Sequence, residues 1–405
     1  MSTLADPDRG QFHLSQLIYD TRYRSMTIQT VAFIGFVAAF TWLIYNTVQN
    51  LEALGKDFNF GFLGVRSGYD INQRLIEYSS DSTHGRAAVV GLLNTLLVAF
   101  LGCIMATFVG VLAGILRLSH NWLTARLMTV YIETFRNVPV LLWIIAFFAV
   151  LTESTPAPSA FRGEDPAASM YLNDSVAITN RGTYIPAPIW GDGSMVVVVV
   201  FLLSLAAIWW FGRWAHKRQE ETGEILPTFW IKLGIFLIPA ILAHFVMGRP
   251  ITLDYPELTG FNFSGGTHMR NSLIALWLAL SIYTGSFIAE NVRAGILAIS
   301  RGQTEAAYAL GLRPSRTMNL VILPQALRVI IPPLISQYLN LTKNSSLAIA
   351  VGYMDLRSTL GGITVNQTGR ELEGILLMML IYLIVSLLIS SAGNLYNATV
   401  KLKER

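Results

Sequence analysis

The polar stretch "NLTKNSS", residues 340–346, is where the sequence places side chains that could hold a small charged ligand. It interrupts an apolar run from Val329 to Gly352, and Lys343 would lie about 21 Å along a helix that starts at Val329. A lysine facing lipid at that depth is costly, so Lys343 should face the protein interior or water. A helix puts three of these polar side chains, together with Gln337 one turn earlier, on one face about 120° wide. This polar face comprises Gln337, Asn340, Lys343 and Asn344.

Two interpretations of the polar face remain open. In one, Lys343 snorkels outward or pairs structurally with another span. In the other, the face lines a pathway in which Lys343 or its neighbours meet a substrate carboxylate. Asn344, Ser345 and Ser346 would then offer uncharged hydrogen bonds.

Glu133 and Arg136 form a second charged pair, directly before the apolar stretch 138–151. A helix over that stretch would be only about 21 Å long, too short for about 30 Å of hydrocarbon, so the span should begin near residue 127. Residues three apart share a helix face, and we expect these two to pair at the inner membrane boundary. The pair is either structural or part of an inner gate.

Residues 301–328, "RGQTEAAYALGLRPSRTMNLVILPQALR", predict two short helices around a tight turn. Thr304 can cap the first helix and Gly311 can end it in a left-handed conformation. Pro314 can start the second helix, and Pro324 is expected to break it before the next span. The spacing alone also fits an amphipathic hairpin on the membrane surface.

Catalytic, metal and nucleotide sites find no support in the sequence. The six histidines are scattered, with no partner at metal-ligand spacing. No G-x-x-x-x-G-K-[ST] loop is present to cradle nucleotide phosphates. We therefore assign no catalytic residue, metal or cofactor to this chain, and if ATP drives its activity, another polypeptide must bind it.

The elements that position these residues are membrane spans. The chain is 53% hydrophobic and 13% charged, whereas an ordinary soluble domain is roughly 25% charged. Apolar runs of about 20 residues predict an all-α polytopic membrane protein with about eight transmembrane helices. They cover residues 28–46, 88–116, 127–151, 195–212, 229–247, 272–289, 329–352 and 374–396.

Most of the 29 lysines and arginines fall in the two terminal segments and in alternate loops. Because short basic loops stay inside, we expect both termini to be cytoplasmic. This bias explains the pI of about 9.1 without nucleic acid as a partner. The only cysteine, Cys103, can form no internal disulfide.

The segment 301–328 also carries a recognisable signature: E-A-A, three residues, G, nine residues, I, one residue, L-P. In this register the chain resembles the membrane-spanning subunits of bacterial ATP-binding-cassette (ABC) importers, with valine replacing the isoleucine. Three further stretches, "GLLNTLLVAF", "ETFRNVPVLLWI" and "LPQALRVIIPPLISQYLNLTKNSSLA", are similar to the polar amino-acid branch, and the whole chain resembles the longer permease of general L-amino-acid importers. The signature residues are Glu305, Ala306, Ala307, Gly311, Val321, Leu323 and Pro324.

The resemblance implies a type I ABC importer permease that passes amino acids from an extracytoplasmic binding protein across the inner membrane. It implies a second permease subunit, making a heterodimer, and two ATPase subunits that hold ATP and Mg. Ala306, Ala307 and Gly311 would let the coupling helix approach the ATPase closely, and Glu305 would pair with a basic residue there. In similar permeases for cationic amino acids an acidic residue can stand at the position of Asn344, so an amide there fits broad specificity.

The resemblance also implies three parts. Residues 1–87 would form an N-terminal cytoplasmic segment, a first span and an extracytoplasmic loop. Residues 88–395 would form the transmembrane domain, with an insert over about 152–271 and a cytoplasmic coupling segment over about 293–328. Residues 396–405 would form a cytoplasmic tail.

Two other classes of protein fit the sequence less well. An ion-coupled secondary transporter usually carries intramembrane carboxylates, whereas the acidic residues here lie near the ends of the predicted spans. A membrane enzyme would need a clustered catalytic set, which the sequence lacks.

Overall fold

The computed structural model describes residues 16–19, 21–53, 55, 57–163, 165–224 and 226–400. Most of the expected N-terminal cytoplasmic segment and residues 401–405 of the expected tail lie outside the described residues. The chain divides into two compact units, residues 1–62 and 63–405. The first unit contains α1 (Gln16–Tyr19) and the long helix α2 (Thr21–Ala53). Residues 31–45 of α2 are apolar except Thr41, and all are exposed, as expected of a helix that lies in lipid.

Eight helices in the described part of the chain are long and apolar enough to cross a membrane, which confirms the predicted fold class and number of spans. They are Tyr23–Ala53, His84–Arg117, Val140–Phe161, Ser194–Thr222, Thr228–Val246, Asn271–Leu297, Pro314–Val351 and Glu371–Asn397.

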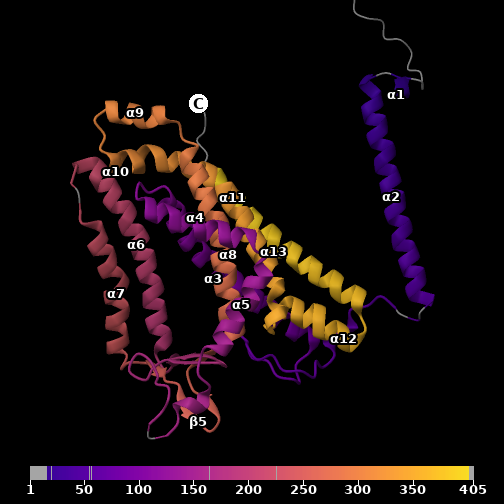
Figure 1. The fold of residues 1–405 in the computed structure, drawn as a ribbon, viewed down its shortest axis with the longest axis horizontal. Helices are drawn as coiled ribbons and strands as arrows, with labels where there is room; N and C mark the ends of the chain where they lie inside the picture. Colours follow the sequence, from indigo (N-terminus) through magenta and orange to yellow (C-terminus); the bar gives the residue numbers. More distant parts are fainter. Residues whose placement is uncertain are drawn as a thin grey trace, which may run out of the picture. The chain divides into compact units, whose positions relative to one another are not determined.

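The second unit is mostly helical (Figure 1). Its α-helices are α3 (His84–Arg117), α4 (Trp122–Asn137), α5 (Val140–Glu153), α6 (Ser194–Thr222), α7 (Thr228–Val246), α8 (Asn271–Leu297), α9 (Arg301–Ala309), α10 (Pro314–Thr317), α11 (Leu323–Asn344), α12 (Val365–Thr368) and α13 (Glu371–Val400). Shorter 3-10 helices cover Gly61–Gly64, Pro158–Phe161 and Ser345–Val351, and π-helical turns cover Met318–Ile322 and Arg357–Thr364.

Helix α8 is the centre of the core. In its most apolar stretch 67% of the residues are buried, compared with 33% in α3 and 6% in α13. One cluster of buried side chains joins α8 to α3, α5 and α11. At Gly114 in α3 a Cβ atom would lie 2.6 Å from the carbonyl oxygen of Ala289 in α8. The missing side chain therefore lets the two backbones approach closely, as small residues do in membrane helix pairs.

The third span begins later than predicted. Helix α4 ends at Asn137, Val138 is extended with φ −105° and ψ 133°, and α5 starts at Val140. Pro139 has no N–H to donate and its ring disfavours a helical residue before it, so one helix cannot run from residue 127 to 151. The expectation of a continuous span that includes Glu133 and Arg136 was therefore wrong.

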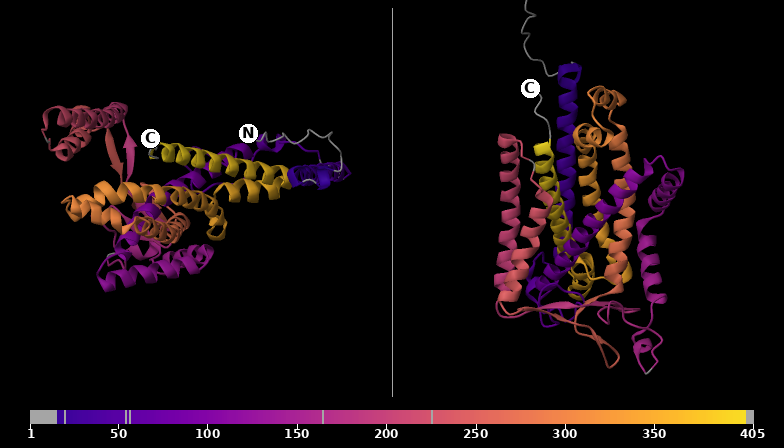
Figure 2. Two further views of the ribbon diagram at one scale, coloured as in Figure 1. Left: turned by 90° about the horizontal axis from the view of Figure 1, so that it is seen from above. Right: turned by 90° about the vertical axis from the view of Figure 1, so that its left-hand side faces the viewer.

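Short strands and a helical hairpin occupy the segment between α5 and α8. The strands are β1 (Ala177–Thr179), β2 (Gly182–Ile185), β3 (Ala187–Trp190), β4 (Ile251–Asp254), β5 (Glu257–Thr259), β6 (Asn262–Ser264) and β7 (Thr267–Met269). They pair antiparallel in the orders β1-β2-β7, β3-β4 and β5-β6. Seen from above in Figure 2, the α6–α7 hairpin stands apart from the other helices, with strands bridging to it.

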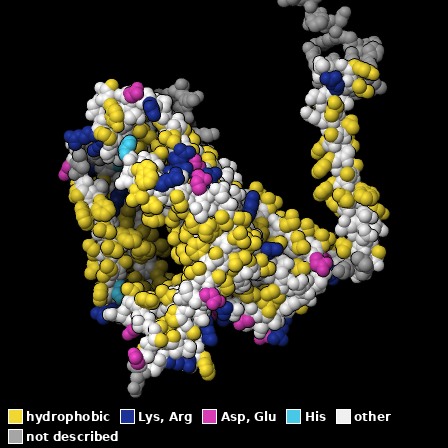
Figure 3. Space-filling model, viewed as in Figure 1, with side chains coloured by type: hydrophobic (Ala, Val, Ile, Leu, Met, Phe, Trp, Pro, Cys, Tyr) yellow, Lys and Arg dark blue, Asp and Glu magenta, His cyan; other side chains and the backbone are white. Residues whose placement is uncertain are grey.

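The surface of the second unit separates side chains by type (Figure 3). Hydrophobic side chains cover the middle of its helices, and charged side chains gather mainly toward its two ends. This distribution suits a protein whose middle lies in hydrocarbon and whose ends lie in water.

Candidate functional site

The coupling segment folds around Gly311. Gly311 has φ +76°, its N–H donates to the carbonyl of Tyr308 (2.9 Å), and the N–H of Leu312 donates to the carbonyl of Ala307 (3.1 Å). These two bonds form a Schellman motif, which satisfies the last carbonyl groups of α9 and requires a left-handed residue. The predicted left-handed helix end at Gly311 is confirmed.

Two details of this segment differ from expectation. Helix α9 begins at Arg301, with Ser300 rather than Thr304 at the N-cap position. Pro324 does not break the second helix, because it lies in the first turn of α11, and Pro314–Val351 forms one continuous span. The π-helical turn before Pro324 absorbs its missing N–H without ending the helix.

The signature residues differ in exposure. Glu305, Ala306 and Gly311 are exposed on α9 and its end, as are Leu323 and Pro324 at the start of α11. Ala307 is buried, with 3% of its surface exposed, so it packs inside the chain instead of on its surface. Of the E-A-A and G positions of the signature, Glu305, Ala306 and Gly311 are therefore exposed and Ala307 is not.

The polar face lies at the end of α11. Asn340 and Lys343 are exposed, and Gln337 and Asn344 are half-buried. None of the ion pairs found among the described residues includes Lys343. Its ammonium group is therefore left free on a span that is otherwise largely apolar.

The two serines that follow Asn344 lie differently. Ser345 is fully buried and its hydroxyl donates to the carbonyl of Thr342 (2.7 Å), so it points into the core, away from the polar face. Ser346 is half-buried, and its carbonyl accepts a hydrogen bond from Arg357 (3.3 Å). The change from α-helix to 3-10 helix at Ser345 rotates these positions relative to a regular α-helix.

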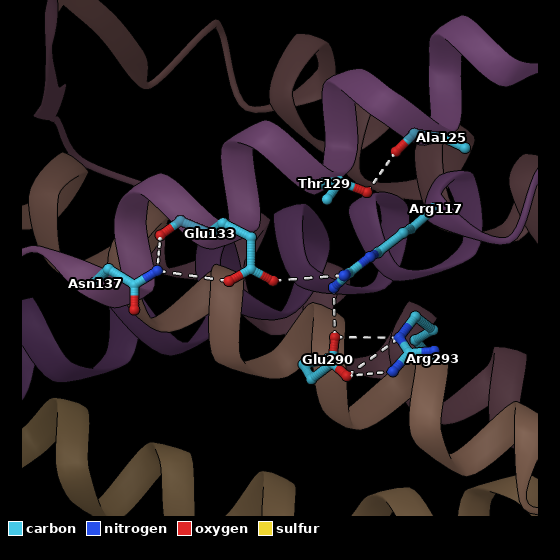
Figure 4. A network of polar contacts seen from close by, with 7 residues as sticks. All are labelled: Arg117, Ala125, Thr129, Glu133, Asn137, Glu290 and Arg293. Atoms are coloured by element: carbon cyan, nitrogen blue, oxygen red, sulfur yellow. Dashed lines mark hydrogen bonds and ion pairs between the residues drawn. The ribbon is translucent and has the colours of Figure 1, made fainter.

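A cluster of charged side chains joins α3, α4 and α8 (Figure 4). Arg117 lies 2.5 Å from a carboxylate oxygen of Glu290 and 3.5 Å from one of Glu133. Arg293 pairs with the other oxygen of Glu290 at 2.5 Å. The cluster therefore crosslinks the ends of three helices that are distant in sequence.

The expected pair of Glu133 with Arg136 is wrong. Glu133 turns to Arg117 and to the side chain of Asn137, whereas the Arg136 guanidinium lies 5.3 Å from the ring centroid of Phe287 in α8. Sequence spacing placed both residues on one face, but their partners come from α3 and α8.

A buried carboxylate, Asp355, was missed by the sequence reasoning. It is fully buried and accepts hydrogen bonds from the backbone N–H and the hydroxyl of Ser358 (2.9 and 2.8 Å) and from the hydroxyl of Tyr382 in α13 (3.3 Å). No cation among the described residues pairs with it, and burial raises the pKa of its carboxyl above the usual range. It ties the segment after the polar face to α13.

The only sequence signal for Asp355 was a lone acidic residue within "VGYMDLRSTL", which looked like the end of a span.

The chain is similar in sequence to known transport proteins. A family model described as binding-protein-dependent transport system inner membrane component matches residues 221–400. The glutamate/glutamine/aspartate/asparagine transport system permease protein BztB of Rhodobacter capsulatus is 58% identical over the full length of both chains. The general L-amino acid transport system permease protein AapQ of Rhizobium johnstonii is 46% identical over 96% of this chain and 95% of its own.

Two further matches are more distant. The putative amino-acid ABC transporter permease protein YhdX of Escherichia coli is 43% identical over 94% of this chain and 95% of its own. A crystal structure of an amino acid ABC transporter with histidines matches with a TM-score of 0.45 at 18% identity, over 78% of this chain and 95% of that chain. Because these relatives are 43% or more identical over nearly their full length, the chain belongs to the family of membrane-spanning permease subunits of amino-acid ABC importers.

Proposed function

We propose that this chain is the translocation subunit of an importer for polar L-amino acids, acidic and amide ones among them. It works with a second, different permease, two ATPase subunits that hold ATP and Mg, and an extracytoplasmic binding protein. It lies in the inner membrane with both termini in the cytoplasm. The names of two relatives support the substrate class, since one names glutamate, glutamine, aspartate and asparagine and the other L-amino acids in general.

The observation that carries the substrate chemistry is the free ammonium of Lys343. It is exposed, has no ion pair among the described residues, and belongs to the same polar face of α11 as Asn340 and Asn344. Every amino acid has an α-carboxylate for such a cation, and an amide can donate to or accept from an acidic or an amide side chain. The polar face therefore suits a pathway that holds the common carboxylate and tolerates several side chains.

The ATPase would act through α9. Glu305, Ala306 and Gly311 are exposed there, and α9 follows directly after α8, the most buried span of the core. Movement of α9 by a closing ATPase dimer would thus reach the centre of the helix bundle. Such rigid-body movement is a common way to switch a transporter between inward and outward openings.

The experiment is competitive uptake of labelled amino acids in vesicles that hold equal amounts of each assembled complex. Lys343→Met is expected to abolish uptake while the complex still assembles. Asn344→Asp is expected to shift preference toward arginine and lysine over glutamate. Lys217→Met is the matched control, because Lys217 is an exposed lysine on α6 that pairs with Glu221.

Unchanged rates and an unchanged order of preference in both test variants would refute the role of the polar face. A loss of uptake as large in Lys217→Met would show that removal of any lysine is harmful and would refute it too.

A further inference from the structure

An exposed aromatic side chain, Phe261, lies at the tip of the β5–β6 hairpin. The hairpin pairs Thr259 with Asn262 across a two-residue turn, in which Gly260 has φ +61°. Glycine favours that conformation in tight hairpin turns, but the second position commonly holds a small or polar residue. Here it holds a phenylalanine with 84% of its surface exposed.

Two exposed arginines frame Phe261. The guanidinium carbon of Arg162 lies 5.3 Å from the centroid of the phenylalanine ring, and Arg181 donates a hydrogen bond to the Phe261 carbonyl (3.3 Å). Both arginines come from the segment before α6, about 80 or more residues earlier in the chain. The three residues are therefore brought together by the fold, and we name them the docking face.

The docking face rests on a small core of its own. Phe161, next to Arg162, meets Phe263 edge to face with ring centroids 5.2 Å apart. Ala177, Tyr184 and Phe263 are buried together in this cluster. Because the base is packed, Phe261 is presented on a folded support, which lowers the entropy lost when a partner binds.

The position of the tip indicates a partner in water. In Figure 1, β5 lies beyond the ends of α5, α6 and α7, away from the middle of the helices that suits hydrocarbon. This place suits a surface that faces water rather than hydrocarbon. Aromatic residues, phenylalanine among them, and arginine are enriched at protein interfaces, and two arginines favour an acidic partner surface.

We propose that Phe261, Arg162 and Arg181 are a docking face for the extracytoplasmic binding protein, which presents an apolar pocket edged by carboxylates. This proposal rests on the proposed function, because it needs the segment between α5 and α8 to lie outside and a binding protein to deliver the substrate.

The test uses the assembled complex in proteoliposomes and measures ATP hydrolysis as the concentration of substrate-loaded binding protein increases. Phe261→Ser and the double variant Arg162→Glu/Arg181→Glu are each expected to raise the half-maximal concentration about tenfold or more. Hydrolysis without binding protein and the maximal stimulated rate should stay as in the wild type. Phe261→Tyr keeps the ring and should behave as the wild type.

The matched control for charge is Arg66→Glu, since Arg66 is an exposed arginine that pairs with Asp81 in the loop before α3. Wild-type half-maximal concentrations in both test variants would overturn the docking face, as would an equal increase in Arg66→Glu. A defect confined to the maximal rate would also overturn it, because that result indicates a distorted permease. If the wild-type complex shows no stimulation by the binding protein, the proposed function fails and the docking face fails with it.

Discussion

Replacing Gly311 tests whether the end of α9 is needed for its backbone conformation or for close approach of the ATPase. A Cβ atom at Gly311 would meet no heavy atom within 4 Å, so alanine or leucine has room in this chain. The φ of +76° is the obstacle, because an L-residue in the left-handed region costs roughly 1–2 kcal/mol. That cost is a factor of about 5–30 in the population of the Schellman motif.

Three substitutions distinguish the two roles. Gly311→Ala should lower substrate-stimulated ATP hydrolysis and uptake by up to the factor of about 5–30, because of backbone strain at position 311 alone. Gly311→Asn keeps the turn, because asparagine tolerates the left-handed conformation, but it adds a side chain to the exposed surface. If the ATPase approaches closely, as we propose, Gly311→Asn should also lose coupling, and Gly311→Leu should lose it almost completely.

The assay is ATP-driven uptake in proteoliposomes, with the amount of assembled complex and its thermal unfolding measured for each variant. Normal uptake by Gly311→Leu at wild-type levels would refute the docking of α9. Wild-type coupling in Gly311→Asn together with a loss in Gly311→Ala would show that only the turn matters.

Glu290→Gln removes the carboxylate that pairs with two arginines in the charged cluster of α3, α4 and α8, and it should lower the free energy of unfolding of the purified protein by about 1–3 kcal/mol, measured by denaturation. Glu133→Gln, at a longer and more exposed contact, should lower it clearly less, and equal losses would contradict the contact geometry. Burial lowers the pKa of His268, so the folded state favours the neutral ring. This preference stabilises the folded state above about pH 6.5, and that stabilisation is lost as the pH falls through the lowered pKa. The midpoint temperature of thermal unfolding should therefore fall more steeply below pH 6.5 in the wild type than in His268→Phe. Parallel plots of this temperature against pH would rule out a contribution from His268. Cysteine at Ser169 should react with a membrane-impermeant thiol reagent from outside and cysteine at Ser315 only from inside; reversed labelling would overturn the proposed topology.

The coupling segment was predictable to within a turn because its signals are local. A glycine between two short helices and a proline at the start of the second act on their own backbone, and the structure has both features in place. The predicted break at Pro324 was wrong. A proline breaks an isolated helix, whereas here a π-helical turn before it and the packing of α11 allow the helix to continue. The burial of Ala307 could not be predicted either. A helix of nine residues such as α9 has two faces, and only the fold decides which of them is covered.

The sequence by itself determined the class, the number of spans and the family. Hydropathy predicts spans because lipid solvates each helix separately, so a run of about 20 apolar residues is sufficient information. Tertiary structure alone decided which polar groups meet. Local spacing suggested that Glu133 pairs with Arg136, but in the fold Glu133 contacts Arg117. Arg117 also donates a hydrogen bond to Glu290, 173 residues away, and Asp355 accepts one from Tyr382 on another helix. A charge in a membrane protein takes the partner that the packing of helices brings nearest, and that distance is not encoded in any single span.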